Sequence, residues 1–216
     1  MTVSSDRGPA SVEDEPAVAQ EIFGQKIDLV RRFVQNLDRE GEIRGLIGPL
    51  ERQRLWTRHI LNCGVLASLI RPGIIGDVGT GAGLPGIVLA LTRPDASFVL
   101  IEPMERRVAW LTEQVTDLGL DNVRVIRARS QDLQPRLHLD QVTARAVSSL
   151  KKLLPLTTPL LRDGGELLLM KGSSVHDEIA AAQRELAFHQ VHDVEVIVLG
   201  EGKLTEVTRV LRAKVR

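Results

Sequence analysis

The stretch Ile74-Ile75-Gly76-Asp77-Val78-Gly79-Thr80-Gly81-Ala82-Gly83-Leu84-Pro85-Gly86 decides the fold class of this chain. Its first five residues form a short, mostly apolar run of the kind that becomes a buried strand, and a glycine loop follows. From Leu84 to Leu91 the apolar residues have helical spacing. A strand, a glycine loop and a helix in this order predict a ligand-binding loop at the carboxyl end of a parallel strand.

Short apolar runs and helical periods alternate around this loop. The expected strands are residues 74–78, 97–101, 123–126, 141–146 and 165–170, and the expected helices are 84–91, 106–118, 150–161 and 175–187. Two extended runs, 194–199 and 206–215, are joined by Gly200-Glu201-Gly202-Lys203 and predict a closing hairpin. The series predicts an α/β fold with a mostly parallel, seven-stranded sheet, helices on both faces and an antiparallel C-terminal hairpin.

The residues before the alternating series predict a different organisation. Residues 1–18 mix Ser, Pro, Asp and Glu, and we expect a disordered tail there. Apolar residues at three- and four-residue spacing predict a helix over 21–38, and a second helical stretch covers 49–69. We therefore expect a tail at 1–18, a helical extension at 19–71 and the α/β domain at 72–216.

Composition narrows the functional class. The chain has 216 residues, of which 43% are apolar and 26% charged, with one cysteine, five histidines and a net charge of zero. This composition is typical of a globular cytoplasmic protein without a disulfide or a metal cluster. Neither a signal sequence nor a run of about 18 apolar residues is visible. The region 122–172 nevertheless holds nine Lys/Arg against four acids, so a local site for nucleic acid stays open.

Two residues in the decisive stretch indicate which ligand the loop takes. Asp77 places a carboxylate at the end of the strand, where it would repel a pyrophosphate and attract the ammonium and sulfonium of S-adenosylmethionine (AdoMet). Pro85 removes one backbone N–H that a phosphate would use. With Gly79, Gly81 and Gly83, these residues predict an AdoMet site and, for the domain, the Rossmann-like fold of AdoMet-dependent methyltransferases.

An acid at the end of the second strand supports the same prediction. Glu102 lies about twenty residues beyond the loop, where a carboxylate can accept hydrogen bonds from ribose hydroxyls. That contact suits AdoMet and NAD equally well. A solvated acid at a strand end, with glycines that only make a tight turn, is the alternative interpretation for Asp77, Glu102 and the loop.

With these residues in view, the sequence resembles the RsmG (GidB) family of bacterial small-subunit ribosomal RNA guanine-N7 methyltransferases, from about residue 20 to the end. The resemblance is carried by the glycine loop with its Leu-Pro-Gly continuation and by four further motifs: Arg58-His59-Ile60-Leu61-Asn62, Arg106-Arg107-Val108, Ala144-Arg145-Ala146 and Met170-Lys171-Gly172. The chain departs from the family pattern at 44–48, where many members have Asn-Leu-Thr, and at Gln131, where an acid is usual.

The resemblance implies which residues form the site. It implies AdoMet contacts at Gly79, Leu84, Ser130, Gln131 and Arg145, with Arg129 and Lys171 as RNA-side or active-site cations. It also implies a guanine of 16S ribosomal RNA as the substrate, in free RNA or in the small ribosomal subunit.

The chemistry expected at such a site needs few groups. Guanine N7 has an available lone pair, so methyl transfer requires alignment rather than a general base. Arg145 and Lys171 follow the fourth and fifth strands and would face the crevice, where they could contact the cofactor carboxylate, guanine O6 or a phosphate. Cys63 precedes the loop in an apolar helical stretch, so we expect a buried core residue and not a nucleophile.

The expected RNA-binding residues are Arg58, His59, Arg129, Lys151, Lys152 and Lys171. Three alternatives remain: a strand-end salt bridge for Arg145, a solvated basic face for Arg129 and the lysines, and a packing role for Arg58 and His59.

Three other functions compete with RNA methylation. An AdoMet enzyme for a small molecule would not need the basic region. A non-catalytic RNA-binding module could keep that region and lose cofactor affinity. An NAD-dependent oxidoreductase is disfavoured by Asp77 and Pro85.

Overall fold

The computed structural model describes residues 12–133, 137–145 and 148–216. Its strands are β1 Ile74–Val78, β2 Ser97–Glu102, β3 Val123–Arg127, β4 Leu139–Arg145, β5 Leu161–Lys171, β6 Val191–Leu199 and β7 Thr208–Val215. Its α-helices are α1 Val18–Phe23, α2 Ile27–Glu40, α3 Leu61–Gly64, α4 Gly86–Thr92, α5 Glu105–Asp117, α6 Leu150–Thr157, α7 Val175–Ala181 and α8 Gln183–Phe188. Shorter turns complete the list: η1 Gly24–Lys26, η2 Arg52–Arg54, η3 Leu55–Ile60, η4 Val65–Leu69, η5 Ser130–Leu133 and η6 Thr158–Leu160.

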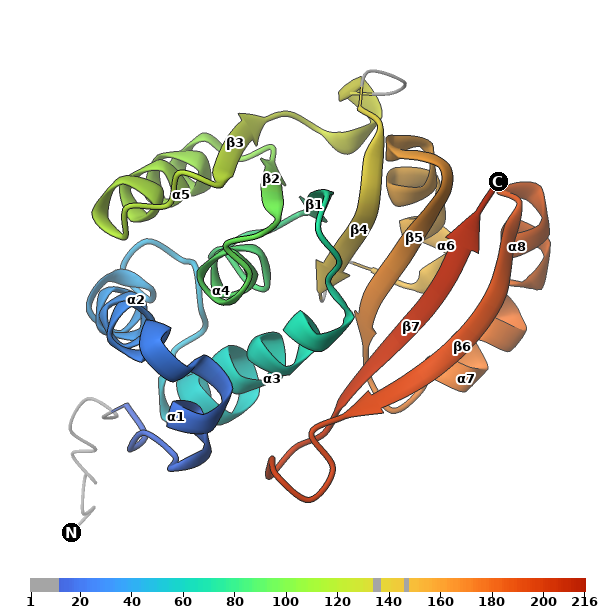
Figure 1. The fold of residues 1–216 in the computed structure, drawn as a ribbon. Coiled ribbons are helices and arrows are strands. Elements are labelled where there is room, and N and C mark those ends of the chain that lie inside the picture. Colours follow the sequence, from blue (N-terminus) through green and yellow to red (C-terminus); the bar gives the residue numbers. More distant parts are fainter. Residues whose placement is uncertain (1–11, 134–136, 146–147) are drawn as a thin grey trace, which may run out of the picture.

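The strands form one seven-stranded sheet in the order β3-β2-β1-β4-β5-β7-β6 (Figure 1). The first five of these strands pair in parallel, and β7 runs antiparallel to both β5 and β6. The predicted fold class, with its parallel series and closing hairpin, is therefore confirmed. Strand β1 has the predicted bounds, and Ala146, the last residue expected in the fourth strand, lies outside the described residues.

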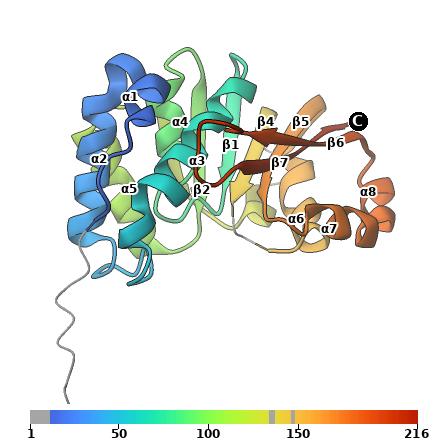
Figure 2. The same ribbon diagram turned by 90° about the horizontal axis from the view of Figure 1, so that it is seen from below.

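Period-two alternation divides the sheet residues between two helical layers (Figures 1 and 2). Phe98 and Leu100 of β2 join a core with α4, α5 and the N-terminal helices, whereas Val99 and Ile101 join a second core with α6, α7 and α8. Neighbouring residues of a strand point to opposite faces, which explains the division. The N-terminal extension shares its core with the α/β domain instead of having one of its own.

The extension differs in detail from the predicted helices. The stretch 21–38 is not one helix, because α1 starts at Val18 and ends before Gly24, whose φ of 50° interrupts the helical path. The expected helical stretch 49–69 is helical from Arg52 to Leu69, as consecutive segments of different winding, of which η3 is a single wide turn of π-helix. Such wide turns often lie at functional sites, and this one carries Arg58 and His59.

Part of the expected tail is packed against the extension. Glu13 accepts hydrogen bonds from the backbone N–H of Thr57 at 2.6 Å and from its Oγ1 at 3.1 Å. Glu15 binds Arg31 through both carboxylate oxygens, at 2.7 and 2.8 Å. Residues 12–17 therefore contact the helices, in contrast to the expected disorder, and residues 1–11 lie outside the described part of the chain.

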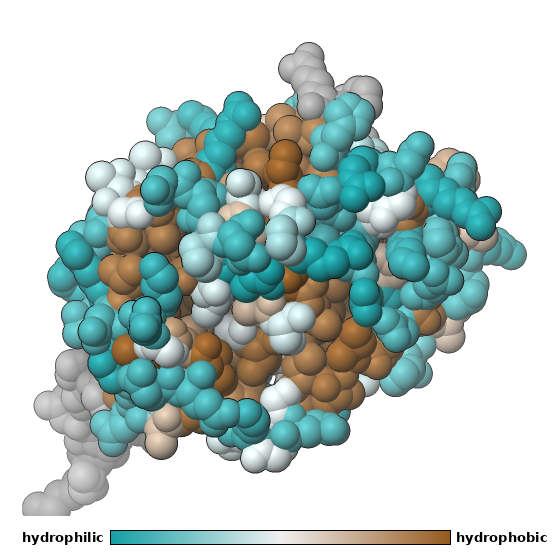
Figure 3. All heavy atoms as spheres, viewed as in Figure 1, coloured by the Kyte–Doolittle hydropathy of each residue, from teal (hydrophilic) through white to brown (hydrophobic). Residues whose placement is uncertain are grey.

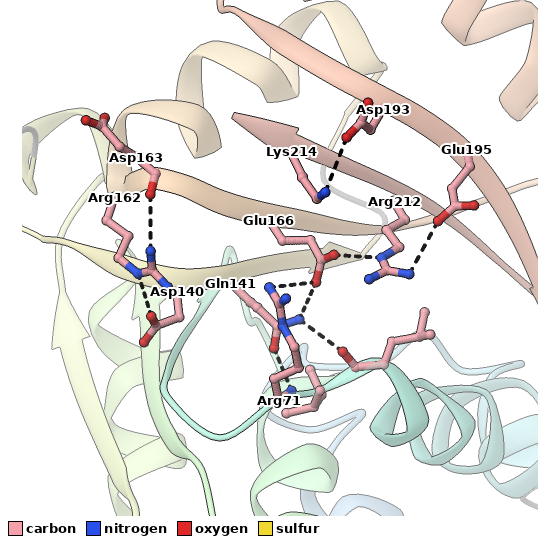
Figure 4. A network of polar contacts seen from close by, with 12 residues as sticks. Arg71, Asp140, Gln141, Arg162, Asp163, Glu166, Asp193, Glu195, Arg212 and Lys214 are labelled. Atoms are coloured by element: carbon pink, nitrogen blue, oxygen red, sulfur yellow. Dashed lines mark hydrogen bonds and ion pairs between the residues drawn. The ribbon is translucent and has the colours of Figure 1, made fainter. Parts of the chain in front are cut away.

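A polar network ties the extension to the amino ends of the strands (Figure 4). Glu166 of β5, 1% exposed, accepts hydrogen bonds from Gln141 and Arg212, both at 2.6 Å. Arg71 approaches the same carboxylate at 3.3 Å, and its backbone N–H donates to Gln141 at 2.8 Å. The buried charge of Glu166 is thus compensated on several sides, as stability of such a group requires.

Figure 3 shows the surface of the face drawn in Figure 1, with hydrophobic residues over the lower part of the β6–β7 hairpin. Val198 of the edge strand β6 is 38% exposed. Among the described residues, no helix is long and apolar enough to cross a membrane.

Candidate active site

A pocket of about 830 Å³ lies at the carboxyl ends of β1, β4 and β5. Segments far apart in the sequence form its walls, as expected for the crevice at a strand-order reversal in an open α/β sheet. The lining residues are 46–48, 51, 58, 59 and 62 of the extension, 79–82 and 84 of the glycine loop, Arg107, Arg145, 170–173, and 206–209 before and in β7.

The glycine loop needs residues without a side chain. Gly79, Gly81 and Gly83 have φ values of 69°, 59° and 95°, which strain other L residues. A Cβ on Gly81 would meet no protein atom closer than 3.8 Å, so it would project into open space in the pocket. A Cβ on Gly83 would lie 2.6 Å from Ile87, which places this glycine against α4 and not on the pocket wall.

Two buried side chains from β2 and α5 hold the loop. Glu102, 2% exposed, accepts hydrogen bonds from the N–H groups of Gly81 at 3.1 Å and Met104 at 3.0 Å. Trp110 is fully buried, and its Nε1 donates to the carbonyl of Ala82 at 3.0 Å. The loop conformation therefore depends on residues that follow it by about twenty to thirty positions.

Asp77 is the penultimate residue of β1, and its side chain is enclosed rather than open at the strand end as expected. Its side chain is fully buried, and Oδ2 accepts a hydrogen bond from the N–H of Gly86 at 2.8 Å, at the start of α4. Burial raises the pKa of this carboxyl to about 6, against the lowering effects of the hydrogen bonds from the Thr80 side chain and the Gly86 N–H and of the nearby Arg145. The carboxylate thus joins the loop to α4 and does not line the pocket wall.

Several buried polar atoms beside the loop have no hydrogen-bond partner among the described residues. They include Arg107 Nε and Asn62 Oδ1, both in residues that line the pocket. Buried polar groups normally have a partner, so atoms of this kind at a pocket are typical of a ligand site. AdoMet carries an amino acid and a ribose that match both acceptors and donors, and the residues present therefore fit this cofactor.

Arg145 and Lys171 both line the pocket but are available to different degrees. Arg145 is half-buried at the end of β4 and has no ion-pair partner among the described residues. Lys171 has a side chain only 7% exposed, and its Nζ contacts Glu178 at 2.6 Å and the carbonyl of Ser148 at 3.1 Å. Arg145 is therefore the cation open to a ligand, whereas Lys171 is engaged within the protein.

The predicted pair Arg58 and His59 belongs to an ionic cluster at the pocket mouth. Arg58 contacts Glu206 at 3.4 Å and Glu51 at 3.6 Å. His59 is 8% exposed, and its Nε2 donates to Glu51. Burial and the positive charge of Arg145 lower the pKa of His59 to about 4, although Glu51 opposes this change. His59 is therefore neutral at pH 7 and too buried to contact RNA phosphates directly.

The other predicted site residues lie outside the pocket wall. Ser130 is buried and Gln131 exposed in η5, which follows β3. Arg129 and Lys152 are exposed without an ion-pair partner among the described residues, whereas Lys151 lies 3.9 Å from Glu185. All five positions follow the carboxyl ends of β3 or β4, so they share the sheet edge with the glycine loop.

Cys63 is a fully buried core residue, as expected. Burial raises the pKa of its thiol to about 11, so the reactive thiolate is not formed near neutral pH. Within the described residues, no group of three or more potential metal ligands comes together.

Among the polar pocket residues without a predicted role are Glu51, Asn62, Glu206 and Arg209. Asn62 closes the quoted Arg58-His59 motif and could have been singled out. Glu206 and Arg209 had no signal, because the segment before and in β7 reaches the pocket only by folding back onto the extension. There Glu206 contacts Arg54 across 152 positions of sequence.

Solved structures share this architecture. TYW2 from M. jannaschii in complex with AdoMet has a TM-score of 0.56 over 74% of this chain and 76% of that chain, at 21% identity. A SAM-dependent O-methyltransferase from Thermotoga maritima has a TM-score of 0.55 over 72% of this chain and 64% of the other, at 14% identity. At such identities the similarity concerns the fold alone.

Sequence relatives are much more similar. The chain is 63% identical to the ribosomal RNA small subunit methyltransferase G of Leifsonia xyli subsp. xyli (strain CTCB07), over 95% of this chain and 99% of that protein. It is 46% identical to the protein of the same name from Thermobifida fusca (strain YX), over 91% of this chain and 84% of the other.

A family model described as rRNA small subunit methyltransferase G matches residues 26–207. The match includes the described pocket segments except residues 208 and 209 of β7. This chain therefore belongs to the rRNA small subunit methyltransferase G family and is an AdoMet-dependent methyltransferase.

Proposed function

We propose that this chain methylates N7 of a guanine in 16S ribosomal RNA, with AdoMet as the methyl donor. The observation that carries the proposal is the family match, which extends over both the glycine loop and the extension that walls the pocket. A pocket of about 830 Å³ has room for the methionine end of the cofactor and for one flipped base.

The residues that bind the cofactor are assigned from their positions. The backbone of Gly79 to Leu84 faces the ligand, with Gly83 as a packing residue behind it. We assign the ribose hydroxyls to Glu102, which lies beneath the loop outside the pocket wall but keeps free lone pairs, because each of its oxygens accepts only one backbone N–H. Ser130 and Gln131 lie on the adenine side, as the family resemblance implies. When bound, AdoMet supplies an electrophilic methyl group on a sulfonium.

No general base is needed for this reaction, because guanine N7 attacks through an in-plane lone pair and loses no proton. Among the described pocket residues, the carboxylate of Glu206 is bound by two arginines, and His59 donates a hydrogen bond to one carboxylate oxygen of Glu51. Arg145, which is not paired there, orients the methionine carboxylate, guanine O6 or a phosphate.

RNA contacts are assigned to exposed cations at the same sheet edge. Arg129, Lys151 and Lys152 flank the pocket, and Arg58 and Arg209 line it. Lys171 and His59 position other groups instead, since both are committed inside the protein. The proposed substrate is 16S RNA within a complete or partly assembled small subunit, and the proposed location is the cytoplasm, where subunits are made.

The test is transfer of labelled methyl from AdoMet to small ribosomal subunits that lack the modification, by rapid quench under single-turnover conditions. Nucleoside analysis should give 7-methylguanosine, and the rate should change little between about pH 6 and 9, because attack needs no deprotonation. Another methylated nucleoside would refute the proposal. A tenfold rise in rate per pH unit near neutrality would reveal a general base.

A second measurement separates the rival functions. Arg145→Met should lower the transfer rate more than it weakens RNA binding, because the side chain lies in the pocket and not on the exposed face. Calorimetric titration with AdoMet should give binding without RNA. A protein that binds RNA but not AdoMet would be a non-catalytic module, and one that methylates without RNA would act on a small molecule.

A further inference from the structure

Two acidic side chains line the pocket among the described residues, and they differ in what they can still bind. The carboxylate of Glu206 is divided between two arginines, with Oε1 on Arg54 and Oε2 on Arg58. Glu51 uses Oε2 for both His59 and Arg58, and its Oε1 has no partner among the described residues. One carboxylate oxygen in the pocket is therefore fixed in place and unused.

The neighbours of Glu51 hold this carboxylate rigidly. His59 lies in the wide turn η3 and is 8% exposed, so the imidazole that donates to Glu51 has little freedom. Arg58, from the same turn, approaches Oε2 at 3.6 Å and bridges to Glu206. A side chain fixed through one oxygen presents the other in a preorganised direction, which is what selective recognition requires.

Glu51 and the glycine loop reach the pocket from different parts of the fold. Glu51 belongs to the N-terminal extension, whereas the loop follows the carboxyl end of β1. A base whose N7 faces the cofactor beside the loop leaves its Watson–Crick edge free for a side chain from another segment of the pocket wall, such as Glu51.

Guanine is the base that this carboxylate suits. Its Watson–Crick edge offers two neighbouring donors, N1–H and the N2 amino group, whereas adenine offers an acceptor at N1. Methylation at N7 also places a positive charge on the guanine ring, which makes N1–H a stronger donor. A fixed carboxylate next to that edge is favoured more in the transition state than in the ground state.

We propose that Glu51 recognises the target guanine, accepting hydrogen bonds from N1–H and N2–H while N7 faces the bound cofactor. This inference rests on the proposed function and adds the residue that selects the base. Arg58 and His59 act on the base indirectly, as positioning residues for the carboxylate. The role of the family motif that contains them is thus to position the Glu51 carboxylate at the pocket mouth.

The test compares guanosine with inosine, which lacks only the 2-amino group. Small subunits are reconstituted with either nucleoside at the position that the wild-type protein methylates, and kcat/KM is measured for the wild type, Glu51→Gln and Glu206→Gln. The wild type should prefer guanosine by about 10-fold or more, the effect of one charge-assisted hydrogen bond. Glu51→Gln should lower the guanosine rate about 10- to 100-fold and reduce the preference to within about 3-fold.

The control and the opposite outcomes separate recognition from structure. Glu206→Gln removes charge from the same pocket and should keep the wild-type preference for guanosine. AdoMet affinity should be unchanged in Glu51→Gln, which shows that the cofactor site is intact. An unchanged preference for guanosine in Glu51→Gln, or no preference in the wild type, overturns the inference about Glu51. The proposed function is tested separately, because it still stands if the product is 7-methylguanosine. If the amide variant does not fold, Glu51→Asp, which keeps the charge but withdraws the oxygens, should also lower the preference.

Discussion

Gly81→Ala should weaken AdoMet binding. Its loss of stability should be no larger than that of Gly119→Ala, which is the matched control. The two glycines have nearly equal φ values of 59° and 63°, and an added Cβ would meet nothing closer than 3.8 Å in the first and nothing within 4 Å in the second. Both variants therefore place alanine in the left-handed region without a protein clash. Only Gly81 lines the pocket.

The expected magnitudes follow from this pairing. An L residue in the left-handed conformation costs about 1–2 kcal/mol, so each variant should lose that much stability. For a chain of this size, the midpoint of thermal unfolding should fall by about 2–4 °C per kcal/mol. The methyl group of Gly81→Ala also occupies ligand space, and AdoMet affinity should fall at least about tenfold, equivalent to about 1.4 kcal/mol.

The assay combines calorimetric titration with AdoMet and denaturant unfolding of the same preparations. The reasoning is refuted if Gly81→Ala binds AdoMet as tightly as the wild type while showing the expected loss of stability. It is also refuted if Gly119→Ala weakens binding equally, because the effect would then come from general destabilisation and not from the pocket.

Three further predictions concern charge and burial. The pKa of Asp77 is raised from its ordinary 3.8 to about 6, which favours the neutral form in the folded state. The wild type should therefore lose about 3 kcal/mol of stability as pH rises from about 4 to about 6, and Asp77→Asn should not. Urea denaturation at several pH values measures this, and the same pH dependence of the free energy of unfolding in both proteins would contradict it. Cys63, with a pKa raised to about 11, should react with a thiol reagent at least about 100-fold more slowly in the native protein than after unfolding, and equal rates would show an accessible thiolate. Arg129→Gln should lower the slope of log RNA affinity against log salt concentration by somewhat under one unit. Lys171→Met should leave that slope unchanged, because the ammonium of Lys171 already pairs with Glu178. RNA titrations at several salt concentrations measure both slopes, and equal slopes for the two variants would refute the assignment.

The sequence by itself determined the architecture of this protein. Strand β1 has the predicted bounds, and the loop after it, the alternating series and the closing hairpin were all visible, because apolar periodicity and glycine positions are local signals. Glycines 79, 81 and 83 marked the loop correctly, since only residues without a side chain adopt its positive φ values at low cost. The break between α1 and α2 lies at Gly24, whose φ of 50° leaves the helical path although the apolar spacing continues through it.

Tertiary structure alone decided which side chains are free to act. Asp77 and Glu51 are both acids, yet one is buried under the loop and the other faces the pocket. Lys171 is paired with Glu178, whereas Arg145 has no such partner among the described residues. Whether a charged side chain can bind a ligand depends on the partners that folding brings to it. These partners are distant in sequence, so the residues around each position do not predict them.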